Sequence, residues 1–218
     1  MLQKVRYIQK YWNSMSKKYA LTTGGSGYIG TAVVAMLVKN GFEVVNLGRN
    51  ECDLTDLNAV SQVAKKVLEK RGAPDVLIHM AAPPLSRIPL AQITPAEVAT
   101  ERTITVGTLE VLTSIFLPHM KGGSVCIGIT TAALAEKIPD TMGAYVTLKN
   151  ELRILLKKLT NDWKEEGIHI YDVAPDFLPG GLNKDLPEGV RNLLARQKDG
   201  TIPTADDVAK TIEKLICG

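Results

Sequence analysis

The sequence of 218 residues is poor in aromatic side chains and carries little net charge. Aromatic residues make up 5% of the chain, which leaves few side chains that could stack on nucleic-acid bases. The formal net charge of +3 is far from the strongly basic balance of proteins that bind a phosphate backbone. We therefore expect no nucleic-acid partner.

Cysteine is too scarce and too irregularly spaced for a disulfide framework or a metal site. The chain has Cys52, Cys126 and Cys217, an odd number without a Cys-x-x-Cys pair. His79 follows an apolar segment, and no second cluster of metal ligands accompanies it, so we interpret it as a buried structural histidine. We expect no metal and a reducing compartment, the cytoplasm.

Long apolar runs are absent near the start of the chain, and so are acidic residues. The first residues contain no run long enough for a membrane span or a signal-peptide core. Residues 1–42 contain no Asp or Glu, but they carry Lys4, Arg6, Lys10, Lys17, Lys18 and Lys39. We divide this region into an extension, residues 1–14, that is flexible and dispensable or contacts a partner, and residues 19–42, where the lack of carboxylates suits an anionic ligand.

Short apolar segments alternate with helical patterns over residues 15–218, which we expect to form one domain. Strands are expected at residues 19–23, 43–47, 75–80, 124–129 and 168–173, and helices at 30–40, 56–71, 95–120, 144–166 and from 204 onward. Strands that are apolar on both faces and separated by helices favour a parallel sheet covered on both sides. The sequence therefore predicts a doubly wound, Rossmann-like α/β/α fold.

A glycine-rich turn joins the first expected strand to the first helix. Residues 23–30 read TGGSGYIG, at the place where backbone N–H groups and a helix N-terminus can bind a pyrophosphate. We assign Gly24 to the tight turn, Gly27 to close approach of the ligand and Gly30 to close packing of the helix against the sheet. The alternative is a flexible turn that binds nothing.

The end of the second expected strand bears on which dinucleotide would bind. Gly48 and Arg49 stand where an acidic residue would contact the ribose of NAD, and a guanidinium suits a 2′-phosphate. The sequence thus favours NADP over NAD. Two alternatives remain: Glu51 faces the ribose, which would favour NAD, or Arg49 is a solvated loop charge.

Tyr145 and Lys149 lie one helical turn apart at the start of a strongly amphipathic helix. An ammonium beside a phenol lowers the pKa of the phenol and makes it a usable acid or base near neutrality. A surface tyrosine beside a solvated lysine is the alternative interpretation. The position of the pair, after the glycine-rich unit and two further strands, favours the catalytic one.

Taken in order, these motifs resemble the short-chain dehydrogenase/reductase family over residues 19–216. The matching segments are TGGSGYIG at 23–30, CDLTD at 52–56, HMAA at 79–82, Thr130-Thr131, Tyr145-x-x-x-Lys149 and the loop from Pro175. The resemblance implies reduction of a carbonyl in a small molecule by NADPH. Tyr145 would protonate the oxygen, and Lys149 would bind the nicotinamide ribose and tune Tyr145. It also implies a homodimer or homotetramer.

The resemblance further implies which residues surround the carbonyl and the cofactor. Thr131, with Thr130 as second choice, would orient the carbonyl in place of the family's serine. Asp53 and Leu54 would lie against the adenine. The whole expected cofactor-binding set is Gly24, Gly25, Ser26, Gly27, Tyr28, Ile29, Gly30, Arg49, Asp53, Leu54, Ala81, Ala82, Lys149 and Pro175.

The chain also departs from the family's pattern. Its glycine spacing and HMAA segment are typical of the extended branch, but the sugar-nucleotide domain of that branch is missing, and the segment between Leu47 and Asp53 is too short for the usual helix and strand. Thr105 stands near the usual relay asparagine, and Asp176 follows Pro175 in place of glycine. These departures motivate two alternatives: a cofactor-binding regulatory or scaffold protein with little turnover, and an NAD-dependent epimerase or dehydratase of a sugar derivative. The substrate depends on the variable loop at residues 177–186.

Overall fold

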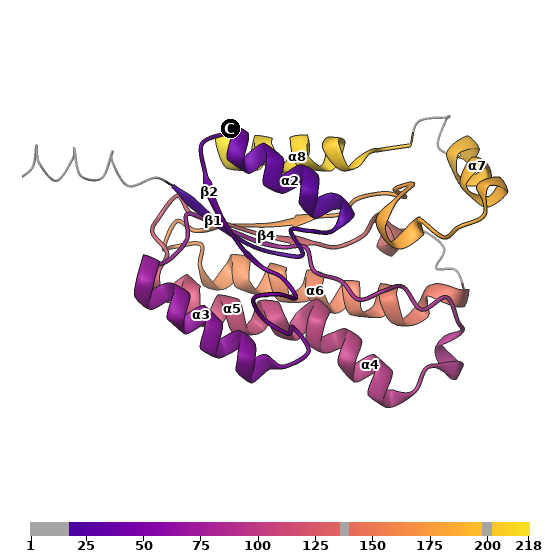
Figure 1. Ribbon diagram of the computed structural model, residues 1–218, viewed down its shortest axis with the longest axis horizontal. Helices are drawn as coiled ribbons and strands as arrows, with labels where there is room; N and C mark the ends of the chain where they lie inside the picture. The colour runs from indigo at the N-terminus through magenta and orange to yellow at the C-terminus, as the bar shows by residue number, and fades with distance from the viewer. Residues whose placement is uncertain (1–17, 136–139, 198–201) are drawn as a thin grey trace, which may run out of the picture.

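A parallel five-stranded sheet forms the middle layer of the molecule (Figure 1). The computed structural model describes residues 18–135, 140–197 and 202–218, so the expected extension at residues 1–14 lies outside the described residues. The strands have the order β2-β1-β3-β4-β5. Their bounds are β1 (Tyr19–Thr23), β2 (Glu43–Leu47), β3 (Val76–His79), β4 (Val125–Ile129) and β5 (His169–Val173).

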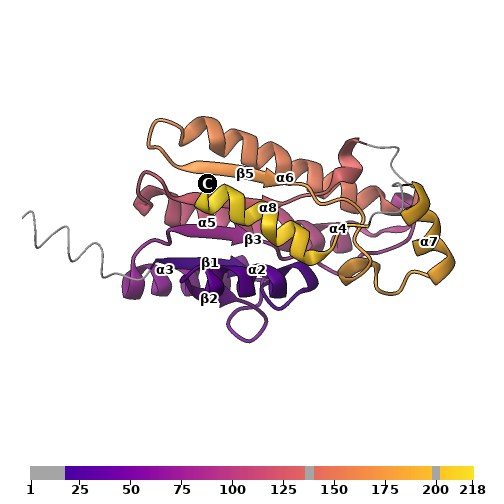
Figure 2. The ribbon, with the colours of Figure 1, turned by 90° about the horizontal axis from the view of Figure 1, so that it is seen from above.

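Helices cover both faces of the sheet, as predicted for a doubly wound fold (Figure 1). One face carries α2 (Tyr28–Lys39) and α8 (Ala205–Cys217), and the other carries α3 (Leu57–Arg71), α5 (Thr108–Phe116) and α6 (Gly143–Asp162). Helix α4 (Pro95–Arg102) leads into a π-turn, Thr103–Gly107, before α5. Helix α7 (Glu188–Gln197) lies at the end of the molecule where the strands finish (Figure 2). No described helix is long and apolar enough to cross a membrane.

The strand sequences explain the position of each strand in the sheet. Every residue of β1, β3 and β4 is buried, because these central strands are covered by helices on both faces. The edge strands β2 and β5 also contain partly and fully exposed positions, and the exposed ones include Glu43 and Asp172. Residues 48–56 lead directly from β2 to α3, in agreement with the short segment seen in the sequence.

Side-chain caps fix the starts of several helices. The Asp56 carboxylate accepts the N–H groups of Asn58 and Ala59 at the start of α3. Thr94 with Glu97, and Thr204 with Asp207, form reciprocal capping boxes on α4 and α8. The predicted start of the last helix at Thr204 is thus confirmed. Helix α7 was not predicted, because it lies beyond the sheet and outside the alternation of strands and helices (Figure 2).

Candidate active site

The loops that follow four strands meet at one edge of the sheet. Because all strands are parallel, the carboxyl ends of β1, β3, β4 and β5 face the same way, which is where doubly wound folds bind ligands. We call residues 23–30 after β1 the glycine turn and residues 129–133 after β4 the threonine turn. These two turns and the loops after β3 and β5 form the candidate site.

The glycine turn is shaped by close backbone contacts. Gly24 has φ of +70°, and a Cβ atom there would lie 2.7 Å from the backbone nitrogen of Ala81. A Cβ atom at Gly30 would lie 2.1 Å from the carbonyl oxygen of Gly24. The tight-turn role of Gly24 is therefore confirmed. Glycine is required at position 30 because a side chain there would collide with the glycine turn. Close packing of the helix against the sheet, the role expected for Gly30, is not the reason.

The start of α2 can receive an anion. The helix begins after Gly27 with no side-chain cap, unlike α3, α4 and α8, and its first turn contains no acidic residue. Its first N–H groups thus point to the turn without a competing carboxylate. The residues fit a pyrophosphate, since the uncapped first turn of α2 follows a glycine-rich segment and offers backbone N–H donors.

Asn46 supports the glycine turn and was missed by the sequence analysis. Its Oδ1 atom accepts the N–H of Gly25 at 2.8 Å and the hydroxyl of Thr22 at 3.1 Å. A Cβ atom at Gly25 would lie 2.5 Å from the same oxygen. The one signal in the sequence is an amide side chain within the otherwise apolar end of β2.

The residues expected near the adenosine lie on the surface beside β2. Arg49 is exposed and has no hydrogen-bond or ion-pair partner within the part of the chain that the structure describes. Glu51 Oε2 accepts the N–H of Gly48 at 3.0 Å. Asp53 Oδ1 accepts the N–H and the hydroxyl of Thr55, and these bonds lower the pKa of the Asp53 carboxyl. Leu54 is partly buried against the core.

His79 joins β3 to the glycine turn and the π-turn. Its Nδ1 atom lies 2.7 Å from Thr23 Oγ1, and its Nε2 atom lies 3.0 Å from the carbonyl oxygen of Thr105. Since a carbonyl can only accept, Nε2 carries the proton and Nδ1 accepts from Thr23. Burial, with a smaller effect of Lys149, lowers the pKa of His79 to about 4. The expected buried structural histidine is confirmed.

The loop after β3 carries the two alanines expected beside the cofactor. Ala81 is buried next to the glycine turn, and its N–H donates to Thr23 Oγ1 at 3.4 Å. Ala82 follows it and is partly buried. Ala81 thus lies beside the glycine turn, and the expected closeness of Ala81 and Ala82 to a cofactor stays a prediction.

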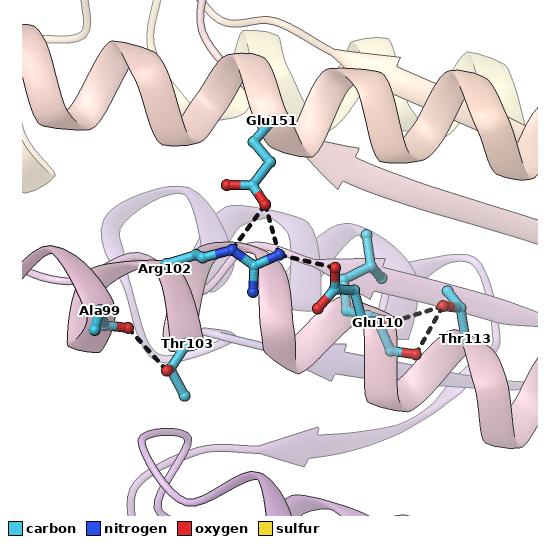
Figure 3. A network of polar contacts seen from close by, with 7 residues as sticks. Ala99, Arg102, Thr103, Glu110, Thr113 and Glu151 are labelled. Atoms are coloured by element: carbon cyan, nitrogen blue, oxygen red, sulfur yellow. Dashed lines mark hydrogen bonds and ion pairs between the residues drawn. The ribbon is translucent and has the colours of Figure 1, made fainter.

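The π-turn is flanked by a polar network that joins three helices (Figure 3). Arg102 donates from Nε to Glu151 Oε1 of α6 at 2.7 Å and from Nη2 to Glu110 Oε1 of α5 at 3.0 Å. Its side chain is about as exposed as those of both glutamates, so the network lies at the surface. Thr105 is buried within the π-turn.

The threonine turn brings Tyr145, Thr131 and Lys149 together. A side-chain hydrogen bond joins Tyr145 to Thr131. Lys149 Nζ donates to the carbonyl oxygen of Ile129 at 2.7 Å and lies 5.8 Å from the centre of the Tyr145 ring. The Thr130 hydroxyl instead donates to Asp172 Oδ1. Of the two expected threonines, Thr131 is therefore the one that contacts Tyr145.

Burial dominates the protonation of this cluster. It raises the pKa of Tyr145, and the hydrogen bond with Thr131 opposes this effect. The expected lowering of that pKa by Lys149 is therefore wrong, because removal of the phenol from water outweighs the effect of neighbouring groups. Burial also lowers the pKa of Lys149 to about 8, and the nearby charge of Asp172 opposes this effect.

The loop after β5 closes this side of the site. The pairing of β4 with β5 continues into the turns, where Thr130 N donates to Val173 O at 2.8 Å and Ala132 N donates to Pro175 O at 2.9 Å. Asp176 Oδ1 accepts the N–H of Phe177 at 2.7 Å.

Further along, the same loop contacts the loops after β1 and β3. Gly180 packs against the Tyr28 ring, where a Cβ atom would lie 2.5 Å from a ring carbon. Arg87 Nη2 donates to Asn183 Oδ1 at 2.7 Å. The structure thus brings Tyr28, from the expected cofactor set, into contact with the predicted functional loop.

Known proteins match both the sequence and the fold. A family model described as enoyl-(acyl carrier protein) reductase matches residues 28–216. An uncharacterised oxidoreductase of Staphylococcus saprophyticus is 25% identical over 207 residues, covering 83% of this chain and 86% of the relative. Dehydrogenase/reductase SDR family member 6 of Xenopus laevis is 24% identical over 215 residues, covering 88% of this chain and 86% of the relative.

Solved structures agree with the observed topology. A short-chain dehydrogenase of Burkholderia cenocepacia in complex with NADP has a TM-score of 0.82 at 21% identity, covering 91% of this chain and 90% of that one. A 3-ketoacyl-(acyl-carrier-protein) reductase of Brucella melitensis complexed with NADH has a TM-score of 0.79 at 17% identity, with the same coverage of both chains. The family model matches residues 28–216, most of this chain, and together with these findings it shows that the chain belongs to the short-chain dehydrogenase/reductase family of oxidoreductases.

Proposed function

We propose that the protein reduces a carbonyl group of a small molecule, with NADPH as the hydride donor and Tyr145 as the general acid. The observation that carries this proposal is the contact of Tyr145 with Thr131, beside the buried Lys149, at the sheet edge that also holds the glycine turn. Acid, hydrogen-bond donor and cation thus surround one point where a carbonyl oxygen could bind.

Each member of the cluster has a distinct task in this mechanism. NADPH held at the glycine turn, residues 23–30, would supply the hydride for the carbonyl carbon. The Tyr145 hydroxyl gives its proton to the oxygen, and the Thr131 hydroxyl stabilises the charge that develops there. A raised pKa keeps the phenol protonated until that step. The Lys149 ammonium, whose pKa is about 8, is mostly charged at neutral pH and stabilises the phenolate that remains.

The preference for NADPH rests on the residues that follow β2. Arg49 is exposed without a partner in the described chain, so it is free to pair with a 2′-phosphate. Glu51, the residue that would favour NAD, already accepts the N–H of Gly48. Solved neighbours of this fold include one complex with NADP and another with NADH, so the fold alone does not decide between the two cofactors. We therefore base the preference on the side chains after β2.

Replacement of Tyr145 by phenylalanine tests the mechanism. Turnover should fall by at least about a hundredfold, because the proton donor is lost, while the affinity for NADPH measured by calorimetry should stay the same. The panel of test substrates should contain aldehydes, ketones and quinones. It should also contain enoyl thioesters, because the matched family model is named for enoyl reduction. A Y145F enzyme with the wild-type rate would refute the role of Tyr145.

Two further outcomes would point to the alternative functions. Binding of NADPH without oxidation across the whole panel would favour a regulatory or scaffold protein, for which Thr105 near the relay position and Asp176 in place of the family's glycine are the motivating features. Tightly bound NAD that copurifies with the protein would favour an epimerase or dehydratase. We also propose a homodimer or homotetramer, which light scattering would measure.

A further inference from the structure

Arg153 continues the line of Tyr145 and Lys149 along α6. The three residues are spaced by four, so they share one face of the helix. Arg153 Nε lies 2.6 Å from Asp172 Oδ2 of β5, and the two side chains are 23% and 24% exposed. Asp172 pairs in the sheet with Gly128 of β4, just before the threonine turn. The ion pair therefore lies beside the cluster that carries the proposed chemistry.

Both members of the ion pair contact the threonine turn. The second carboxylate oxygen of Asp172 accepts the Thr130 hydroxyl. Arg153 Nη2 lies 3.4 Å from the carbonyl oxygen of Thr131 and 3.5 Å from Thr130 Oγ1. Because the Thr131 side chain bonds to Tyr145, two contacts lead from the ion pair to the phenol. A partly exposed ion pair contributes little to stability, so its geometry matters here mainly for the turn that it holds.

The same ion pair adjusts the charge around Lys149. The groups that face Lys149 are Tyr145 from α6, His79 from β3 and Asp172 from β5. His79 is neutral near pH 7, so Asp172 is the charged group whose attraction opposes the effect of burial on Lys149. Arg153 partly neutralises Asp172. Removal of the aspartate and removal of the arginine should therefore have opposite effects on the ammonium.

Building on the proposed function, we propose that Arg153 and Asp172 are positioning residues, which hold Thr131 against Tyr145 and balance the charge beside Lys149. Neither touches the reacting atoms in this role. The pair acts through Thr130, Thr131 and Lys149.

Two single variants of the full chain, D172N and R153M, test this inference. Nuclear magnetic resonance of lysine labelled at Cε would follow the titration of Lys149, whose signal is assigned by its loss in K149M. D172N should lower the pKa of Lys149, because an attractive charge is lost. R153M should raise it, because Asp172 is no longer neutralised. E151Q is the matched control: it weakens another arginine–carboxylate pair of α6 (Figure 3) and should leave the titration unchanged.

Kinetics add a second measurement. D172N should lower kcat by about tenfold, in line with the loss of one charge-assisted hydrogen bond, and should leave the KM for NADPH unchanged. R153M should also lower kcat, because the threonine turn loses its contacts with the guanidinium, and R153K, which keeps the cation, should recover most of that activity. If a single variant fails to fold by circular dichroism, the double variant R153M/D172N removes both charges, and its Lys149 pKa should lie closer to the wild-type value than that of the single variant that folds.

Shifts of the Lys149 pKa in the same direction in both single variants, or no shift in either, would overturn the inference. The titration requires no turnover, so it tests the ion pair even where Y145F refutes the proposed function. Conversely, if Y145F inactivates the enzyme and the Lys149 titration does not move, the proposed function stands and the positioning role falls.

Discussion

The glycine turn and the threonine turn lie at the same edge of the sheet but are built differently. Backbone geometry shapes the glycine turn, through a left-handed Gly24 and the missing side chain of Gly30. Side chains shape the threonine turn, through the contacts of Thr130 with Asp172 and of Lys149 with the Ile129 carbonyl. The first turn should therefore fail structurally when an atom is added. Removal of a side-chain group from the threonine turn should leave the fold intact and lower the catalytic activity.

The largest expected effect is at Gly30. In G30A the new methyl group would collide with the Gly24 carbonyl, so we expect a loss of about 3 kcal/mol or more in unfolding free energy and loss of NADPH binding. Urea denaturation and calorimetry would measure both. G189A in α7 is the matched control, because nothing lies near a Cβ atom there and alanine should stabilise the helix slightly. Equal effects of both variants would contradict a turn shaped by close contacts.

Acid should weaken the link that His79 makes between the glycine turn and the π-turn. Its pKa of about 4 in the folded state lies below the ordinary value of 6.5, so the unfolded chain takes up the proton first. Stability contributed by the neutral ring is complete above pH 6.5 and is lost as pH falls toward 4, in total about 3 kcal/mol.

Urea midpoints measured across this pH range would show the loss. The H79Q variant should have a lower starting stability and a smaller loss on acidification. The H119Q variant replaces an exposed histidine and should behave like the wild type. A wild-type midpoint that stays constant between pH 6.5 and 4.5 would rule out this account of His79.

Replacement of Lys149 by methionine should separate stability from activity. Burial of the ammonium is unfavourable at neutral pH, as its pKa of about 8 shows. K149M should thus keep or gain stability, by up to about 2 kcal/mol after loss of the bond to Ile129 O, while turnover is lost. In the wild type, Lys149 should add stability as pH rises from 8 to 10.5, and K149M should lack this rise. A strongly destabilised K149M would show that the lysine is a structural residue.

The smallest effect is expected at Arg49, an exposed side chain beside the backbone-shaped half of the site. R49A should raise the KM for NADPH by about tenfold, since one charge-assisted contact with the 2′-phosphate is lost. The KM for NADH should not change, because NADH lacks that phosphate. Steady-state kinetics with both cofactors would measure the ratio. An equal change for both would argue against recognition of the phosphate by Arg49.

The fold could be predicted from the sequence where local patterns decide it. β1 and β2 agree with the expected residues, because short apolar segments end at glycine-containing turns. The start of α8 follows from the capping residues Thr204 and Asp207. Helix α7 could not be found in this way, because it is polar and lies beyond the sheet, outside the alternation of strands and helices (Figure 2).

The site could be predicted only in part, for a related reason. Tyr145, Lys149 and the glycine turn are local motifs, and the structure brings the first two together with Thr131. The contact of Arg153 with Asp172 joins α6 to β5 and has no local pattern. The direction of the Tyr145 pKa shift depends on burial, which is decided by elements far apart in the sequence.

The extension of the β4–β5 pairing beyond the strands makes the threonine turn part of the sheet. The amide hydrogens of Thr130 and Ala132 are bonded to Val173 and Pro175, so they should exchange with solvent deuterium as slowly as those of the central strands. A substrate that enters the site therefore meets a rigid wall on this side.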